Sequence, residues 1–422
     1  MLKTFASIAA AVGIALAGVA APGFAGATVA KHIRPTRHAV HSRHTLTTHH
    51  HVRRARHHHP GTGGPGPQPT PSPSPTHSPP VPPPGLGSGG TGPVKPDVTG
   101  LLDRGRTPTV AVGGSNFNVL PVTWLGAVQG FVVNATWADL QPVQGGPIVR
   151  PNVIDRAIAA AGGTRHFKIR IWAGEYAPAW AKSLDGSPLP TVSGWGIGRW
   201  WTPAYEAAYA DLQAKLAAIY DSVPQVSDVT VSGCMTYYAE PLLKDDVDSG
   251  APLAALLAAG YTNAQDEQCQ QAAIRAHAVW RHTHSSFSFN PYSGLNPAGV
   301  FESFTESLMD YCAQVLGPRC ALENNSIRYP NNPGFYGAMY AHMGLDQARY
   351  GVTVDFQTAT LTKLNTAPEL GLGAALAWAC GGYASPVRAS SVELPAGYST
   401  DGILGTPIAY ASWVNLLAAA PH

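Results

Sequence analysis

The stretch Val226-Ser-Asp-Val-Thr-Val231, followed by Ser232-Gly-Cys-Met-Thr-Tyr-Tyr-Ala-Glu-Pro241, decides the fold. Its first half is rich in β-branched residues, which predicts a buried strand. Its second half places one carboxylate, Glu240, just past the end of that strand, next to a proline and two tyrosines. In a barrel of parallel strands, active sites gather at this end of the strands. The stretch therefore predicts a barrel strand that leads into an active-site loop.

The chemistry of Glu240 follows from its neighbours. A carboxyl group that lies against aromatic rings suits a general acid, because an apolar setting raises its pKa. Aromatic rings also suit the apolar faces of sugars. The alternative interpretation is a loop acid that lies beside core aromatics.

Strand-like and helix-like patterns alternate along residues 97–422. The predicted strands lie near 109–112 and at 130–136, 166–172, 226–231, 286–290, 320–325, 352–357 and 391–394. The predicted helices are 153–161, a helix that opens with Thr202 as N-cap and Pro203, then 272–282, 301–316, 336–349, 372–380 and a closing helix at 409–419. Alternating β and α units imply a parallel sheet, and eight of them imply closure into a single (β/α)8 barrel over 97–422.

The first 30 residues have the pattern of a secretory signal peptide. Lys3 supplies the positive charge, Ile8 to Ala21 is an apolar run, and Ala25-Gly-Ala27 fits a cleavage site. We therefore expect a secreted protein, extracellular or associated with the cell wall. No later stretch has 18 uninterrupted apolar residues, so we expect no membrane span.

Two biased segments separate this signal from the barrel. Residues 31–59 are rich in His and Arg and poor in apolar side chains, so we expect disorder. Their positive charge suits contact with an anionic cell envelope, and clusters such as His49-His-His51 suit Zn²⁺, Cu²⁺ or Ni²⁺. A solvated spacer is the third interpretation. Residues 60–96, rich in Pro, Gly and Ser, predict an extended linker.

The charge of the chain divides at this linker. Residues 1–96 carry nine of the 27 Lys and Arg residues and no acid, so the remainder has 18 basic and 25 acidic residues. A nucleic-acid-binding domain is expected to carry a basic face. The acidic balance of residues 97–422 therefore argues against nucleic acid as a partner.

Five cysteines fit an exported protein. Cys312 and Cys320 bracket a predicted helix-to-strand turn, and we expect them to pair. Cys234 and Cys269 are placed to close the long loop after the strand that precedes Glu240. Cys380 would then remain as a buried free thiol. A Cys/His metal site lacks the usual ligand spacing.

Three segments resemble the β-galactosidase-like clan of (β/α)8-barrel glycoside hydrolases. Those enzymes typically carry W-x-x-L-x-P-x-x-G at their second strand, which is similar to Trp137-Ala-Asp-Leu-Gln-Pro-Val-Gln-Gly145. Their third strand and its sugar-facing loop look like Lys168-Ile-Arg-Ile-Trp-Ala-Gly174 followed by Ala177-Pro-Ala-Trp180. Their Asn-Glu-Pro motif, which carries the acid/base at the end of strand four, looks like Ala239-Glu240-Pro241. The resemblance covers most of residues 105–400.

The chain departs from this family at two positions. Ala239 stands where the clan usually has Asn, and Gln357 stands where the clan places its nucleophilic Glu at the end of strand seven. An amide is a poor nucleophile, so the standard retaining mechanism does not transfer intact. If Gln357 faces the sugar, it would orient a water molecule or bind a hydroxyl group.

Glycoside hydrolysis normally needs a second carboxylate, about 5–5.5 Å from the first for retention and about 6.5–9.5 Å for inversion. Our first choice is Glu393 on the eighth predicted strand, with Glu323 second and Glu175 and Asp139 third. The alternative for Glu393 is a structural ion pair with Arg170.

The sugar site is expected to use rings for stacking and polar side chains for hydroxyl groups. The candidates near strand ends are Asn134, Trp137, Arg170, Trp172, Trp180, Tyr238, Asn290, Asn324 and Gln357. For each aromatic residue, a place in the barrel core is the alternative.

The first functional hypothesis is a secreted glycoside hydrolase that acts on a polysaccharide or oligosaccharide. Glu240 would protonate the leaving oxygen, Glu393 would act as base or nucleophile, and no metal or organic cofactor is implied. A second hypothesis is a catalytically inactive barrel that binds glycan on the cell envelope, which Gln357 favours. A third is a metal-binding surface protein that acts through residues 31–59.

Overall fold

The computed structural model describes residues 93–106, 114–118, 128–238, 240, 243, 247–292, 295, 302–330, 335–396 and 398. Outside these residues lie the predicted signal peptide, the His/Arg-rich segment and the linker up to residue 92. The strand predicted near 109–112 and the closing helix predicted at 409–419 also lie outside them.

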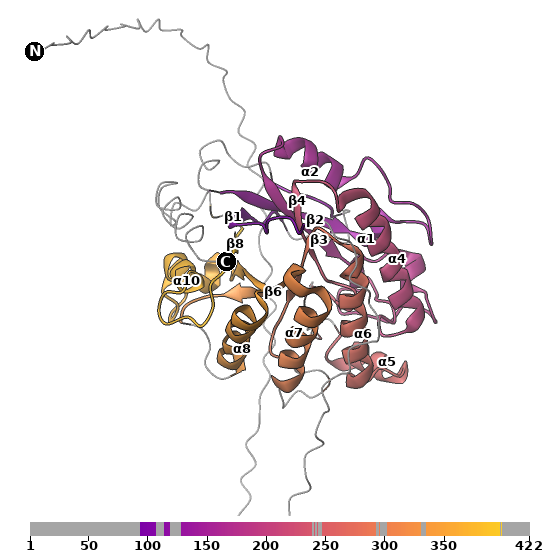
Figure 1. Cartoon of the computed structure of the whole chain (residues 1–422). Helices are drawn as coiled ribbons and strands as arrows, with labels where there is room; N and C mark the ends of the chain where they lie inside the picture. Colours follow the sequence, from indigo (N-terminus) through magenta and orange to yellow (C-terminus); the bar gives the residue numbers. More distant parts are fainter. Residues whose placement is uncertain are drawn as a thin grey trace, which may run out of the picture. The chain divides into compact units, whose positions relative to one another are not determined.

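Eight parallel strands form a closed barrel in chain order, as the sequence predicts (Figure 1). The strands are β1 Gly100–Asp103, β2 Gly130–Thr136, β3 His166–Trp172, β4 Val226–Thr230, β5 His284–Ser288, β6 Cys320–Ile327, β7 Thr353–Thr358 and β8 Ser391–Leu394. Every neighbouring pair, including β1 with β8, is parallel. The fold is therefore a (β/α)8 barrel.

The first strand differs from its predicted place. β1 is Gly100–Asp103, and it closes the barrel by pairing Leu102 with Gly130 of β2 and with Glu393 of β8. The prediction near 109–112 was wrong as an assignment of the first barrel strand. The reason is that Gly-Leu-Leu-Asp is too short to show a strand period, whereas the later stretch is β-branched.

Helices surround the strands (Figure 1). The longer ones are α2 Val153–Ala161, α4 Pro203–Tyr220, α5 Gly250–Ala258, α6 Asn263–Ala276, α7 Glu302–Leu316, α8 Phe335–Tyr350 and α10 Gly371–Ala379. The short ones are α1 Trp137–Leu140, α3 Ala179–Lys182, α9 Leu361–Leu364, and the 3₁₀ turns η3 Gly174–Tyr176, η4 His277–Val279 and η5 Gly317–Arg319.

Two helix starts show how local capping differs from the sequence expectation. α4 begins at Pro203 after Thr202, but the Thr202 hydroxyl donates to the Arg199 carbonyl (2.9 Å) and caps no N–H. α6 begins at Asn263, where the Thr262 hydroxyl accepts from the Gln265 N–H (3.2 Å). The helix predicted at 272–282 was wrong at both ends, because it begins upstream at this cap and ends at Ala276, where the 3₁₀ turn η4 follows.

The side chains of β3 alternate between the two faces of the barrel wall. Successive residues of a strand point to opposite faces. Phe167 and Ile169 belong to the apolar core, and Phe167 stacks on Phe131 at 5.2 Å between ring centroids. Lys168 and Arg170 point to the opposite face, where they meet carboxylates of other strands. The barrel interior is thus charged, while its outer surface is apolar.

Both predicted disulfides are present. Cys234 is bonded to Cys269, and Cys312 is bonded to Cys320. Cys380 is a free thiol that is partly buried, and burial raises its pKa to about 11. Such a thiol is protonated and unreactive near neutral pH.

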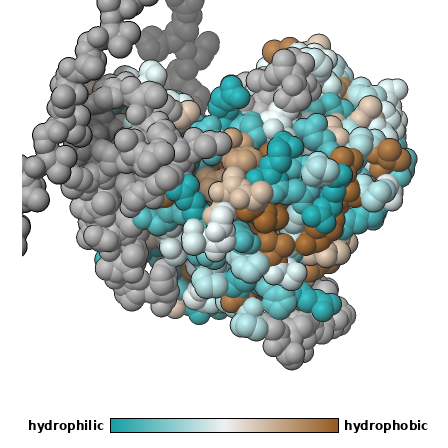
Figure 2. Space-filling view, turned by 90° about the horizontal axis from the view of Figure 1, so that it is seen from above, coloured by the Kyte–Doolittle hydropathy of each residue, from teal (hydrophilic) through white to brown (hydrophobic). Residues whose placement is uncertain are grey.

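No helix in the described part of the chain combines the length and the apolar character that crossing a bilayer requires. On the face drawn in Figure 2, apolar residues occur in small patches between polar ones. Single exposed apolar residues of this kind are ordinary for a protein surface.

Candidate functional site

A cavity of about 440 Å³ lies at the carboxyl ends of the barrel strands. Its lining is Arg104, Asn134, Arg170, Trp172, Tyr238, Glu240, Asn290, Asn325, Ser326, Arg328, Tyr336, Gln357, Thr358, Ala359, Thr360 and Lys363. Trp172 is the last residue of β3 and Thr358 the last of β7. This is the end of a (β/α)8 barrel at which active sites are found.

Seven of the predicted site residues meet in this cavity. They are Asn134, Arg170, Trp172, Tyr238, Glu240, Asn290 and Gln357. They come from separate parts of the chain and converge because each lies in the carboxyl-terminal half of a barrel strand or in the segment that follows it. Trp172 is held in place by its indole N–H, which donates to Asn134 Oδ1 (3.0 Å).

The segment between β4 and Glu240 is fastened at several points. The Ser232 N–H donates to the Tyr209 hydroxyl oxygen (3.0 Å), and Cys234 is bonded to Cys269 on α6. The Ala173 N–H donates to Met235 Sδ (3.1 Å), so the loop after β3 holds this segment as well. These contacts fix the path of the chain as it leads to Glu240.

Gly174 makes the closest of these approaches. Its φ is +54°, in the left-handed region that favours glycine, and an added Cβ would lie 1.9 Å from the Thr236 carbonyl oxygen. The next residue donates its N–H to that same oxygen (Glu175 to Thr236, 3.1 Å). A side chain at position 174 would therefore push the two loops apart.

Glu240 is partly buried and is the one carboxylate among the described lining residues. Its negative charge acts across the cavity on Arg170 and Tyr336 and raises the pKa of both. Burial lowers the pKa of Arg170. The carboxylates of Glu393, Glu323 and Glu240 raise it by a larger amount, so the net shift of the pKa is upward. Arg170 therefore carries a permanent positive charge in the cavity.

Glu393, the predicted second acid, lies outside the cavity lining and is fully buried. Its Oε1 atom is 2.5 Å from Arg170 Nη2 and 3.4 Å from Lys168 Nζ. Arg170 lines the cavity, so its guanidinium group stands between Glu393 and the cavity. The ion pair with Arg170 is thus present, and a direct catalytic role for Glu393 stays a prediction that needs Arg170 to move.

Lys168 lies at the centre of a buried cluster of charges in the barrel. Its Nζ atom is 3.0 Å from Glu323, 3.4 Å from Asp228 and 3.9 Å from Asp355, in addition to its contact with Glu393. Burial lowers the pKa of Lys168, but these four carboxylates raise it well above its ordinary value. Burial also raises the pKa of Glu323, whereas Lys168 and Arg170 lower it to about 2.

Gln357 lines the cavity at the position where the resembling family has its nucleophile. Its amide Nε2 donates to the Asn325 carbonyl (2.9 Å). This bond fixes the orientation of the amide and leaves Oε1 as an acceptor that a ligand hydroxyl can use.

Trp137, Trp180 and Asn324 were predicted as site residues, but none of them is among the lining residues. Trp137 is fully buried and donates to Gln141 Oε1 (3.2 Å), while the Trp180 indole donates to the Gln141 carbonyl (3.1 Å). The Trp137 motif thus orders a structural corner after β2. Asn324 faces α8, where it accepts from the Tyr340 hydroxyl (3.0 Å).

The other candidates for a second carboxylate also have partners outside the cavity. Glu323 is fully buried beside Lys168, and Glu175 accepts from the Ser193 hydroxyl (2.6 Å). Asp139, on α1, accepts from the Ser115 hydroxyl (2.5 Å), so it pairs with the segment between β1 and β2. None of these three lines the cavity.

Sequence reasoning missed several lining residues, above all the cations Arg104, Arg328 and Lys363. Arg104 directly follows β1, and a correct first strand would have brought it to the mouth of the barrel. Asn325 lines the cavity in place of Asn324, because neighbouring residues on β6 face opposite sides.

No protein-family model and no curated protein sequence matches the chain. Among solved structures, the catalytic domain of β-amylase from Paenibacillus polymyxa is 9% identical at a TM-score of 0.49, over 78% of this chain and 100% of that domain. An endo-β-1,4-glucanase from Xanthomonas axonopodis pv. citri is 13% identical at 0.46, over 76% and 99%. Endo-glycoceramidase II from Rhodococcus sp. is 14% identical at 0.38, over 72% and 76%. Each of these structures covers at least 72% of the chain at an identity of 14% or less.

Proposed function

We propose that the protein is a glycoside hydrolase that uses Glu240 as its general acid. The observation that carries the proposal is the position of this carboxylate in a polar cavity at the mouth of the barrel. The cavity volume of about 440 Å³ falls within the range of about 300–1,000 Å³ that is usual for ligand pockets. Trp172, Tyr238 and Tyr336 offer ring faces to a pyranose.

Unused hydrogen-bonding atoms support a ligand rich in hydroxyl groups. Asn290 Nδ2, Asn325 Oδ1 and Arg170 Nε are buried atoms on cavity-lining residues, and none has a hydrogen-bond partner among the described residues. Buried polar atoms are normally satisfied, and each orphan requires an explanation. A sugar, whose hydroxyl groups each donate and accept hydrogen bonds, supplies such partners.

The charge of the cavity favours a substrate with acidic groups. Arg104, Arg170, Arg328 and Lys363 face a single described carboxylate, Glu240. Two of these cations are paired with carboxylates outside the cavity lining, Arg328 with Glu369 (3.0 Å) and Arg170 with Glu393. The excess positive charge of the cavity therefore comes from Arg104 and Lys363. We therefore propose an acidic polysaccharide or oligosaccharide, such as one that contains uronic acid.

The proposed reaction needs a base as well as an acid. Glu240 gives its proton to the glycosidic oxygen, the bond from that oxygen to the anomeric carbon breaks, and a water molecule adds to the carbon while a second carboxylate takes its proton. We propose Glu393 for the second role. Its Oε2 has no hydrogen-bond partner among the described residues, and an acidic substrate that attracts Arg170 would uncover it.

We also propose that the protein acts outside the cytoplasm, as a secreted or wall-associated enzyme. Two disulfides support this location, because such bonds persist in oxidising compartments. Contact of residues 31–59 with an anionic envelope remains part of the same proposal.

The test is the release of reducing sugar from a panel of neutral and acidic polysaccharides, with the full chain and its Glu240→Gln variant. The variant is expected to lose about 10²–10⁴-fold in kcat/KM, the usual contribution of general acid catalysis. Glu206→Gln, on the outer helix α4, is the matched control and should keep full activity. Equal activity in the wild type and in Glu240→Gln would refute the assignment.

A second candidate function is glycan binding without hydrolysis. It is favoured by Gln357 at the usual nucleophile position and by Glu240 as the one carboxylate among the described lining residues. In this case the panel gives binding, measured by calorimetry, in both the wild type and Glu240→Gln, and neither protein releases product.

A further inference from the structure

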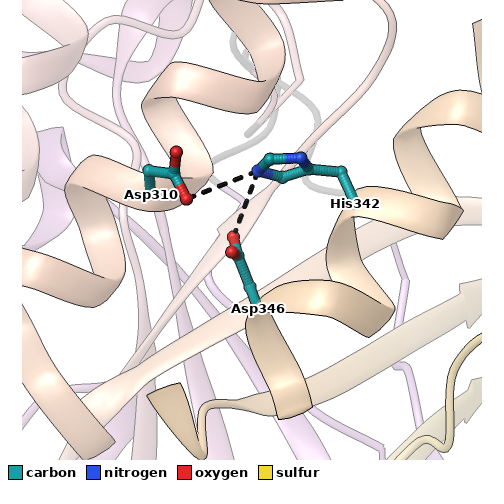
Figure 3. Close-up of side chains that lie close together, drawn as sticks. All are labelled: Asp310, His342 and Asp346. Atoms are coloured by element: carbon teal, nitrogen blue, oxygen red, sulfur yellow. Dashed lines mark ion pairs between the residues drawn. The ribbon is translucent and has the colours of Figure 1, made fainter. Parts of the chain in front are cut away.

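Three potential metal ligands meet on the outside of the barrel, where α7 and α8 pack side by side (Figure 1). Asp310 lies on α7, and His342 and Asp346 lie one turn apart on α8. Figure 3 shows the imidazole of His342 pointing its Nε2 atom at both carboxylates. One ligand atom from each of the three residues lies within 4.8 Å of the other two.

The distances within this cluster are long for hydrogen bonds. His342 Nε2 is 3.4 Å from Asp310 Oδ1 and 3.6 Å from Asp346 Oδ2, whereas an N–H···O bond spans about 2.7–3.2 Å. All three atoms are buried and have no hydrogen-bond partner among the described residues. His342 thus forms a long ion pair with each acid, and none of these three atoms has a hydrogen bond of ordinary length to a described residue.

The same distances fit the edges of a metal coordination tetrahedron. Zinc binds imidazole nitrogen and carboxylate oxygen at about 2.0–2.2 Å, which sets neighbouring ligand atoms about 3.3–3.6 Å apart in a tetrahedron. The two separations from His342 Nε2 lie within that range.

The charge of the cluster also calls for a cation. The side chain of Asp346 is 2% exposed, and it lies next to a second carboxylate, Asp310, which is 32% exposed. Arg349, one turn further along α8, lies over the Tyr350 ring at 4.8 Å from its centroid. A proton, either shared by the two acids or carried by His342 between them, is the other way to offset their repulsion.

We propose that Asp310, His342 and Asp346 form a site for a divalent transition metal ion, with Zn²⁺ as its best match. One nitrogen and two oxygen ligands suit zinc, whereas Ca²⁺ takes six to eight oxygen ligands. Solvent supplies the remaining position, because Asp310 and His342 are both partly exposed.

This site is separate from the cavity and serves stability. Tyr336, near the start of α8, lines the cavity, and Asp346 lies about 15 Å further along the helix axis at 1.5 Å per residue. A metal ion there joins α7 to α8 in the folded state and has no preformed site in the unfolded chain.

The test measures thermal unfolding of the full chain after removal of metal with a chelator, with and without ZnCl₂. At a hundredfold excess of Zn²⁺ over its Kd, we expect the Tm to rise by about 4 °C for a domain of this size. His342→Gln and Asp346→Asn should lose this rise, while the control Asp248→Asn, an exposed acid, should keep it. Residues 31–59 are present in every protein compared, so metal binding by their histidines cancels.

Asp346→Asn imitates the protonated acid, so its Tm without metal is expected to equal or exceed that of the wild type. This measurement, with His342→Gln as a second variant, separates loss of the site from loss of folding. The proposal is overturned if Zn²⁺ leaves the wild-type Tm unchanged, or if it raises the Tm of the two ligand variants equally. A rise with CaCl₂ and none with ZnCl₂ would overturn the choice of metal.

Discussion

Replacing Lys168 by Met tests whether the charged interior of the barrel holds it together. The ammonium group of Lys168 lies within 4 Å of the carboxylates of Asp228, Glu323, Asp355 and Glu393, and all five side chains are fully buried. Methionine has nearly the same length and volume, so the substitution removes the charge with little change in packing. Arg170 would remain as the one described cation in contact with this cluster.

The magnitude follows from the burial of the carboxylates that lose their partner. Removal of one member of a buried ion pair typically costs about 3–5 kcal/mol, because the other charge stays buried and unpaired. We expect a loss in this range in the free energy of unfolding at pH 7. The pKa of Lys168 is raised above 10.5, so its contribution is fully present at neutral pH and would be lost only when the pH rises through the folded-state pKa.

The mutant can relieve the repulsion between its buried carboxylates by protonating one of them, and this protonation costs less free energy as the pH falls. The deficit relative to the wild type should therefore shrink by about 1.4 kcal/mol per pH unit for each carboxylate that takes up a proton.

The assay is urea unfolding at pH 7 and pH 5 with intact disulfides, followed by the fluorescence of the ten tryptophans. Lys215→Met is the matched control, because Lys215 pairs with Asp211 (2.6 Å) on the surface of α4, where such a pair contributes at most about 1 kcal/mol. If both variants lose the same free energy of unfolding, the buried charges are not what stabilises the barrel and our account is wrong.

Two further predictions concern the disulfides and the response to pH. Replacing Cys234 and Cys269 by Ala should lower the free energy of unfolding by about 4 kcal/mol, against about 2.5 kcal/mol for Cys312 and Cys320, because the first disulfide closes a loop of 35 residues and the second a loop of 8. Urea unfolding of the two double variants measures both losses, and a larger loss for the second pair would contradict this order. Burial raises the pKa of Asp97 from 3.8 to about 7, so the folded protein binds an extra proton between these values and this residue favours folding increasingly as the pH falls from about 7 to 4. Asp97→Asn should remove that part of the pH dependence of the Tm, and an unchanged profile would contradict the assignment.

Much of the barrel was predictable because its strands and helices differ in period. Val153–Ala161, His166–Trp172 and Ser391–Leu394 have the predicted bounds. The strand expected at 286–290 lies at His284–Ser288, because its first residues, His-Ser-Ser, do not show the apolar alternation of a strand. Short or polar strands inside a closed barrel are set by pairing with their neighbours, which no local pattern reveals.

The candidate site was predictable where a residue stands at the carboxyl end of its strand. Glu240, Trp172 and Gln357 reach the cavity for this reason. Trp137 does not, because its motif orders a helix start, and Glu393 does not, because Arg170 covers it. Whether Arg170 or Glu393 reaches the cavity depends on contacts between β3 and β8, which are more than 200 residues apart in the sequence.

The charges inside the barrel also guard against mispairing of β3. A strand that slips by one residue turns every side chain to the opposite face of the sheet. Such a slip would place Lys168 and Arg170 against apolar helices and turn Phe167 and Ile169 toward the four interior carboxylates. An interior of aliphatic residues would tolerate several pairings of similar energy, whereas this interior accepts one. The charged network therefore favours a single register of β3 when the barrel folds.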